Sequence, residues 1–215
     1  IGGSCIEVES SGQRILLDVG MPLAASDVLR SLVPVVDSAS LCGIAISHPH
    51  QDHYGLLPWM PSSTPVALGI AARRILMAAA PFTKYPVLNL DGPNLVDRQP
   101  VDLGPFRITP FLVDHSAYDA YALLVEGDGK RLFYSGDLRM HGRKARLMDK
   151  LMATGPKDID VLLLEGTTLG RDDSCTPSLS EADMEVAFQE TFNKTDGLIL
   201  VQTSPQNIDR MVTIY

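Results

Sequence analysis

Three histidines and one aspartate lie within the six-residue segment HPHQDH at positions 48–53. Imidazole nitrogens and carboxylate oxygens bind zinc, manganese and iron ions in proteins. His48 and His50 are two positions apart, a spacing that puts both side chains on one side of an extended chain. Asp52 and His53 follow at the expected start of a helix and can reach the same space from another direction. The segment predicts a metal site, and two ligand pairs in one loop suit two ions better than one.

Two later segments end a predicted strand with a candidate ligand. One strand, over residues 106–113, leads to His115, and another, over residues 131–137, ends at Asp137. A carboxylate can bridge two cations, whereas a histidine cannot, so Asp137 is expected between the ions and His115 at one of them. The alternative to a metal site is that these side chains are loop residues whose polar groups are satisfied by hydrogen bonds. That alternative suits a lone histidine better than a cluster with two further strand-end ligands.

The elements that would position these ligands follow from the hydrophobic pattern. Strands are expected over residues 4–10, 13–20, 41–47, 64–70, 106–113, 120–127, 131–137 and 159–167, the last of them buried. Helices are expected over residues 26–32, 71–80 and 143–154. The stretch 81–104 should be loop with one short strand. Because loops at strand ends are free to present side chains, the ligands are expected at such ends.

A second pattern begins near residue 170. A helix is expected over residues 180–194, where Ser180 stands three residues before Asp183, close to a capping box. A strand over residues 197–204 and a helix with Pro205 at its first position should follow. This alternation of strand and helix is typical of an α/β unit.

The chain is therefore expected to contain one domain over residues 1–168 and the beginning of a second over residues 169–215. It opens at Ile1 without methionine and stops at Tyr215 inside a predicted helix. We therefore expect it to be part of a longer protein.

The motifs SHPHQDH, VDHS and YSGDLR, preceded by LLDVG, resemble the metallo-β-lactamase superfamily over nearly the whole of residues 1–165. The resemblance implies an α+β fold, an αββα sandwich of two sheets flanked by helices, with a binuclear site at one edge. It implies that the first ion is bound by His48, His50 and His115, and the second by Asp52 and His53, with Asp137 between the two. Asp18 matches an acidic residue that supports the metal loop from behind the ligands. True β-lactamases usually have cysteine where Asp137 stands, which argues against antibiotic hydrolysis.

A narrower resemblance is to the β-CASP branch, which includes ribonuclease J and the mRNA 3′-end processing nucleases. SGDLRMHGRK and LLLEGTTLGR are similar to segments of that branch, and the second makes Glu165 its candidate acidic residue. The helix from Ser180 and the segment GLILVQTSPQNIDRM look like the opening of the inserted β-CASP domain. Further histidine motifs of the branch, with a last ligand of the second ion, would lie beyond Tyr215. Without them the second ion would be weakly held or absent.

The resemblance implies a metal-dependent phosphodiesterase, a ribonuclease of the ribonuclease J type. Two divalent ions, zinc first and manganese or iron as alternatives, would share a bridging hydroxide that attacks phosphorus. Asp52 and His53 are the candidate catalytic residues, with Asp52 orienting the hydroxide and accepting its proton. RNA is expected as substrate in preference to DNA. A small-molecule hydrolase acting on a thioester or lactone and a non-catalytic metal-binding scaffold are the alternatives.

A basic segment, RMHGRKARLMDK over residues 139–150, follows Asp137 and contains a single acid, Asp149. Its cations are Arg139, Arg143, Lys144, Arg146 and Lys150. Together with His141, they could contact substrate phosphates by charge attraction, whereas a solvated helix face is the alternative for any single one. For Glu165, the alternative to the acidic motif residue is a strand-end residue that fixes the junction between the two domains.

The composition narrows the class of protein. The net charge of −8 argues against a protein that coats nucleic acid, although bound cations can reverse the field locally. No apolar run approaches the roughly 20 residues of a membrane span, and no segment resembles a signal peptide, so no membrane partner is expected. Cys5, Cys42 and Cys175 match no metal or redox pattern and suit a reducing cytosol. We therefore expect a cytoplasmic protein, and no pattern indicates an oligomeric state.

Overall fold

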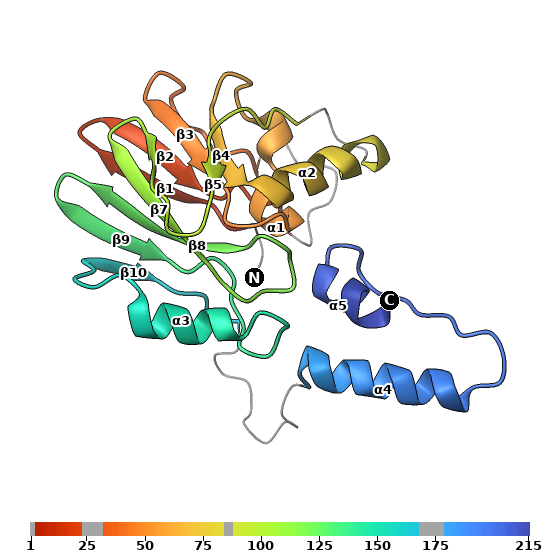
Figure 1. Ribbon diagram of the computed structural model, residues 1–215. Coiled ribbons are helices and arrows are strands. Elements are labelled where there is room, and N and C mark those ends of the chain that lie inside the picture. Colours follow the sequence, from red (N-terminus) through yellow and green to blue (C-terminus); the bar gives the residue numbers. More distant parts are fainter. Residues whose placement is uncertain (1–2, 23–31, 84–87, 168–178) are drawn as a thin grey trace.

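Two five-stranded sheets organise the computed structural model, which describes residues 3–22, 32–83, 88–167 and 179–215 (Figure 1). The first sheet has the order β1-β2-β3-β4-β5, and the second has the order β10-β9-β8-β7-β6. The first consists of β1 (Ile6–Ser10), β2 (Gln13–Leu17), β3 (Leu41–Ala45), β4 (Val66–Gly69) and β5 (Asn94–Leu95). The second consists of β6 (Val101–Leu103), β7 (Phe106–Leu112), β8 (Tyr121–Gly127), β9 (Lys130–Tyr134) and β10 (Val161–Leu163).

Alternating side chains of each sheet pack into different cores, because successive residues of a strand point to opposite faces. In β2, Ile15 belongs to the core between the sheets and Leu16 to the core on the outer side of the first sheet. In β8, Leu123 faces the other sheet and Leu124 faces outward. Three apolar layers of this kind require helices on both outer faces.

Those helices are short and lie where the pattern requires them. On the first sheet lie α1 (Gln51–Tyr54) and α2 (Ile70–Ala79), with Ala72 and Leu76 of α2 in its outer core (Figure 1). On the second lies α3 (Arg146–Thr154), which adds Met148 and Leu151 to the core behind that sheet. The layers are therefore helix, sheet, sheet and helix, which confirms the expected α+β sandwich.

The strand directions bring several strand ends to one edge. In the first sheet, β2 and β3 are parallel. In the second, β7 and β9 both run antiparallel to β8, and β10 is parallel to β9. The two edges meet at a hydrogen bond of 2.9 Å from the backbone N–H of Tyr121 to the carbonyl oxygen of Ser47. Residues that follow β2, β3, β7, β9 and β10 are thus directed to a common edge.

Most strands and helices expected for the sandwich are present, with two main differences. The stretch 81–104 contains two short strands, β5 and β6, instead of one. The strand expected over residues 159–167 is only β10, and the prediction that it is buried is wrong, since Val161 and Leu162 are exposed. The physical reason is that β10 is an edge strand whose one partner is β9. The helix expected over residues 26–32 falls almost wholly outside the described residues.

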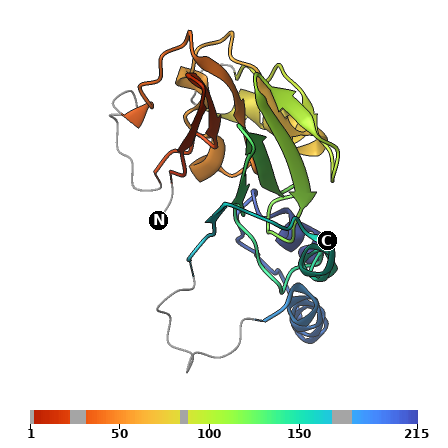
Figure 2. The same ribbon diagram turned by 90° about the vertical axis from the view of Figure 1, so that its left-hand side faces the viewer.

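Two helices follow the sandwich; they lie to the right of β10 and α3 in Figure 1 and toward the lower end of the molecule in Figure 2. The first, α4 (Glu181–Lys194), begins with the expected capping box between Ser180 and Asp183. The second, α5 (Ile208–Ile214), begins three residues later than predicted, because the side chain of Asn207 and not the ring of Pro205 starts it.

The strand predicted over residues 197–204 is wrong. The segment pairs with no other strand of the described chain, and Leu198 and Leu200 are 86% and 85% exposed. A strand needs a neighbour for its backbone hydrogen bonds, which an apolar pattern alone does not provide. The domain boundary predicted at residue 168 lies outside the described residues and stays a prediction. None of the helices among the described residues has the length and apolar character to cross a membrane.

Candidate metal centre

Four imidazole rings and one carboxylate converge where the two sheets meet. The ring centroid of His48 lies 4.8 Å from that of His50, 4.0 Å from that of His53 and 4.6 Å from that of His115. Two sets of three residues each place one potential ligand atom per residue within 4.8 Å of the others in the set. We call these sets group A and group B. Group A consists of His48, His50 and His115, and group B of His48, His53 and Asp137. The shared His48 links the two groups.

The loop that carries three of these rings is held by backbone hydrogen bonds from the first sheet. Asp52 accepts from the backbone N–H of Ser4 at 2.9 Å, and His53 accepts from that of Val19 at 2.8 Å, each through its carbonyl oxygen. Gly20 packs so closely that an added Cβ would lie 1.6 Å from the carbonyl oxygen of Asp52. Only glycine therefore allows the chain after β2 to approach the histidine loop.

Asp18 is buried behind the centre and organises it through its two carboxylate oxygens. Its Oδ1 accepts from the backbone N–H of Ser47 at 2.7 Å. Its Oδ2 accepts from the hydroxyls of Ser47 at 2.8 Å and Tyr134 at 2.7 Å, and lies 2.7 Å from His53 Nδ1. These contacts fix the ring of His53 so that its Nε2 faces group B. Asp18 thus lies behind the candidate ligands, and its role in supporting them stays a prediction.

The hydrogen bonds of His48 leave one ring nitrogen available to a cation. Because the hydroxyl of Ser47 donates to Asp18, its oxygen can accept from His48 Nδ1, 3.0 Å away. The proton of a neutral ring then sits on Nδ1, and Nε2 carries the lone pair. His48 Nε2 is buried without a hydrogen-bond partner. A buried polar atom without a partner is costly, and a metal ion at this point would satisfy it.

In group A, the ring of His50 is oriented by a residue that follows the sandwich in the chain. Its Nε2 lies 3.3 Å from the carbonyl oxygen of Gln206, to which it can donate. Its Nδ1 then faces His115 Nε2 at 3.1 Å. Nitrogen ligands about 2.0–2.1 Å from a tetrahedral ion lie about 3.4 Å apart, so this pair is close to ligand spacing. The donor set and its spacing fit a divalent cation.

In group B, a histidine and a carboxylate face each other. His53 Nε2 lies 3.3 Å from Asp137 Oδ1 and 3.9 Å from Asp52 Oδ2. Asp52 lies beside the group without belonging to either group among the described residues. The loop of Asp137 is held by Glu165, whose Oε1 accepts from the backbone N–H of Leu138 at 2.7 Å. Glu165 therefore acts on the loop next to the centre and does not lie among the candidate ligands.

The protonation states of the rings differ with their surroundings. Burial lowers the pKa of His48 well below 6.5, lowers that of His50, and lowers that of His115 to about 3. Burial acts in the same direction on His53, but hydrogen bonds and charge attraction from Asp137 and Asp18 outweigh it and raise the pKa of His53 to about 10. The rings of group A are therefore neutral and ready to bind a cation. His53 has to release a proton before its Nε2 can do so.

These shifts predict how the stability of the metal-free protein depends on pH. The neutral rings of His48, His50 and His115 contribute stability above pH 6.5. This contribution is lost as the pH falls, because these three histidines are then protonated more readily in the unfolded chain than in the folded protein. His53 contributes stability that is fully present below 6.5 and is lost as the pH rises toward about 10. Three rings lower the stability when the pH falls below 6.5, and one ring lowers it when the pH rises above 6.5. We therefore expect the free energy of unfolding to peak near neutrality and to fall more steeply on the acid side.

Urea unfolding with a chelator present, at about pH 5, 7 and 9, measures this dependence. A free energy of unfolding that stays constant or rises from about pH 7 to 5 would contradict these protonation states.

The basic segment does not have the free charges expected of it. The prediction that its cations meet only Asp149 is wrong for four of them. Arg139, Arg143 and Lys144 pair with acids of α4, α5 and the chain before His115, and Lys150 pairs with Asp97 at 2.8 Å. The reason is that those acids are distant in sequence. His141 is exposed, and its imidazole is in neither group. It does line a cavity of about 590 Å³ that also reaches His115, Asp137 and Glu165.

Sequence reasoning missed several residues of the centre. Ser47 directly precedes His48, and Tyr134 lies three positions before Asp137 at the end of β9; a polar residue ending a buried strand was the available signal. Gln206 contributes a backbone carbonyl oxygen from a distant segment. A backbone atom leaves no trace in a residue pattern, so no motif could have identified it.

Comparisons with known proteins agree with this architecture. The family model described as "Beta-lactamase superfamily domain" matches residues 13–193. Ribonuclease J of Helicobacter pylori is 25% identical over 98% of this chain, and an RNase J-like protein of Methanocaldococcus jannaschii is 28% identical over 78% of it. The chain spans 32% and 40% of the lengths of these two relatives.

Among solved structures, a protein of unknown function from Enterococcus faecalis V583 superposes with a TM-score of 0.81 at 20% identity. The superposition covers 100% of this chain and 60% of that one. A metallo-β-lactamase of Cronobacter sakazakii superposes with a TM-score of 0.56 at 20% identity, over 76% of this chain and 67% of that one. At these identities, the superpositions show a shared fold.

Proposed function

Because the chain belongs to the metallo-β-lactamase superfamily, and its ligand groups share one histidine, we propose that it is a metal-dependent phosphodiesterase that hydrolyses RNA. The observation that carries the proposal is the convergence of His48, His50 and His115 with His53 and Asp137 in two linked groups. The similarity to ribonuclease J supports RNA as the substrate class. Because the chain spans only part of those relatives, the activity is proposed for the full-length protein.

Two divalent cations, zinc first and manganese or iron as alternatives, are proposed for groups A and B. Such cations lower the pKa of a bound water and neutralise charge on the phosphate that is attacked. His48, His50 and His115 would hold one ion and His53 the other, and Asp137 would be shared by both. Asp52 is proposed as a further ligand of the second ion. The His115–Asp137 edge of the cavity would receive the phosphate.

The residues around the ligands have distinct proposed roles. Asp52 is 22% exposed and lies beside group B, where its carboxylate can orient a water molecule and accept its proton. Asp18 keeps the Nδ1 of His53 occupied, so that Nε2 of the same ring is the atom that would bind a cation. His141 lines the cavity and could donate a hydrogen bond to a substrate phosphate. Glu165 holds the backbone of the loop that carries Asp137.

The residues after the sandwich are proposed to open a β-CASP domain, with the boundary at residues 168 and 169. Support comes from α4 and α5, which follow the sandwich in the chain and pack against each other. Curated relatives named ribonuclease J match across this segment, since one of them covers 98% of the chain.

The proposal is tested with full-length protein loaded with zinc or manganese and offered 5′-labelled single-stranded RNA and DNA of the same sequence. We expect RNA to be cleaved, and cleavage to stop when a chelator removes the metal and to return when metal is restored. Metal-loaded protein that leaves every RNA intact would refute the proposal. Cleavage of DNA in preference to RNA would refute the substrate class alone, and turnover of a thioester without any nuclease activity would favour a small-molecule hydrolase.

A further inference from the structure

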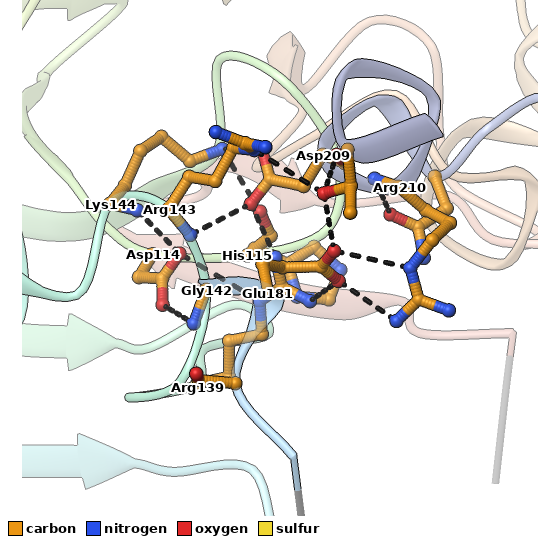
Figure 3. A network of polar contacts seen from close by, with 12 residues as sticks. Asp114, His115, Arg139, Gly142, Arg143, Lys144, Glu181, Asp209 and Arg210 are labelled. Carbon is orange, nitrogen blue, oxygen red and sulfur yellow. Dashed lines mark hydrogen bonds and ion pairs between the residues drawn. The ribbon is translucent and has the colours of Figure 1, made fainter. Parts of the chain in front are cut away.

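A network of buried charges joins α4 and α5 to the loops of the metal centre (Figure 3). Its acids, Asp114, Glu181 and Asp209, are all at least 95% buried. Arg139 lies among them, with an ion pair to Asp209, one of 3.6 Å to Glu181 and one of 3.7 Å to Asp114. Buried carboxylates are stable only when they are paired and hydrogen-bonded, so this arrangement fixes the position of α5 relative to the sandwich.

One arm of the network reaches the loop of His115. Lys144 Nζ donates to the carbonyl oxygens of His115 and Ala117, each at 2.9 Å, and lies 3.4 Å from Asp209 Oδ1. The backbone N–H of Asp209 also donates to the carbonyl oxygen of Ser116, at 3.4 Å. Asp209 therefore contacts this ligand loop directly, and a second time through the ammonium group of Lys144.

A second arm reaches His50. The carbonyl oxygen of Gln206, three residues before Asp209, accepts from His50 Nε2 at 3.3 Å. A metal-binding histidine commonly donates its other ring N–H to such a carbonyl, which fixes the tautomer and the direction of the ring. Residues 206–209 thus contact the ring of His50 and the backbone of the loop that carries His115, although they lie 91 or more positions away from His115 in the sequence.

We propose that Asp209 is a positioning residue for the metal centre, and that the segment 206–209 completes group A by holding His50 and the His115 loop in ligand geometry. The inference rests on the proposed function in one respect, namely that group A binds a divalent cation. Metal affinity in the sandwich then depends on the docking of α5. A helix that leaves its place would release His50 Nε2 and loosen the His115 loop in one step.

The test is a titration of metal-free full-length protein with Co²⁺ alone, followed by visible absorption, which reports the ligands and geometry of the ion. Asp209→Asn removes the charge that pairs with Lys144 and Arg139 while keeping the size of the side chain. Lys144→Met removes the donor to His115 and Ala117 independently. Glu185→Gln is the matched control, because Glu185 on α4 pairs with Arg143 at 2.6 Å but does not contact the ligand loops. Circular dichroism verifies folding of each variant.

We expect Asp209→Asn and Lys144→Met each to weaken cobalt binding roughly tenfold and to change the visible spectrum, as loss of a partner behind a metal ligand does. The double variant should lose less than the product of the two effects, because both act through one contact. Glu185→Gln should bind cobalt as the unaltered protein does. If Asp209→Asn does not fold, Lys144→Met alone decides.

Folded Asp209→Asn and Lys144→Met variants with unchanged affinity and spectrum would overturn the inference, whatever their activity on RNA. An unaltered protein that binds cobalt but cleaves no RNA would refute the proposed function and leave the inference standing. An unaltered protein that binds no cobalt would overturn both.

Discussion

Replacing His48 by alanine should remove RNA hydrolysis and most metal binding together. Nε2 is the one free ring nitrogen of His48 and can bind one ion only, so the loss of His48 leaves group A with two of its three members. A metal ion supplies several kcal/mol of transition-state stabilisation, which corresponds to a rate loss of at least about 1,000-fold. The measurement is the initial rate of RNA cleavage together with the metal content of the purified variant, determined by elemental analysis.

A matched control separates loss of a ligand from loss of stability. Leu124 is buried behind the second sheet, and Leu124→Ala should cost about 2–5 kcal/mol of stability without touching a ligand. At a temperature where both variants are folded, Leu124→Ala should keep its metal and its activity. A His48→Ala protein that retains two ions, or an activity within tenfold of the unaltered protein, would contradict the proposed role of His48 as a ligand of group A.

Replacing Asp18 by alanine should destabilise the protein and weaken its hold on metal at the same time. The carboxylate is fully buried and is contacted by Ser47, Tyr134 and His53. Breaking a buried pair by removing one partner costs about 3–5 kcal/mol. Because His53 then loses the group that fixes its ring, metal affinity should fall by about 10–100-fold. Urea unfolding of the metal-free protein and a zinc titration measure the two effects.

Tyr134→Phe provides the graded comparison. It removes one hydrogen bond to the carboxylate, worth about 1.5–3 kcal/mol, and leaves the contact of 2.7 Å between Asp18 and His53 in place. Its stability should fall less than that of Asp18→Ala, and its metal affinity should change less. Equal zinc affinity in Asp18→Ala and the unaltered protein would show that Asp18 has no influence on the ligands.

The sandwich and the convergence of the ligands could be predicted because their signals are local. The apolar run of β3 ends at the histidine segment, and polar residues such as Asp137 and His115 follow other strands at the same edge. Alternation within β2 and β8 assigns side chains to inner and outer cores, which is a period that a sequence displays directly. The fold class therefore follows from patterns of a few residues.

The errors arose where partners come from distant parts of the chain. The sequence predicts that Arg139 and Lys144 are unpaired cations. Both pair with Asp209, which lies 65 or more positions away, and no local pattern identifies such a distant partner. Residues 197–204 have a strand-like pattern but no neighbouring strand in the described part of the chain, and the exposure of β10 depends on its place at the edge. Such features depend on tertiary contacts, which no local period encodes.

The central claim is that side chains from separate strand ends hold two neighbouring cations, one in group A and one in group B. Anomalous X-ray diffraction from zinc-loaded crystals of the full-length protein tests it most directly, because the signal locates each ion without reference to activity. We expect one peak between the ring nitrogens of His48, His50 and His115, and a second beside His53 and Asp137. Zinc peaks elsewhere on the molecule, with none among these side chains, would contradict the account.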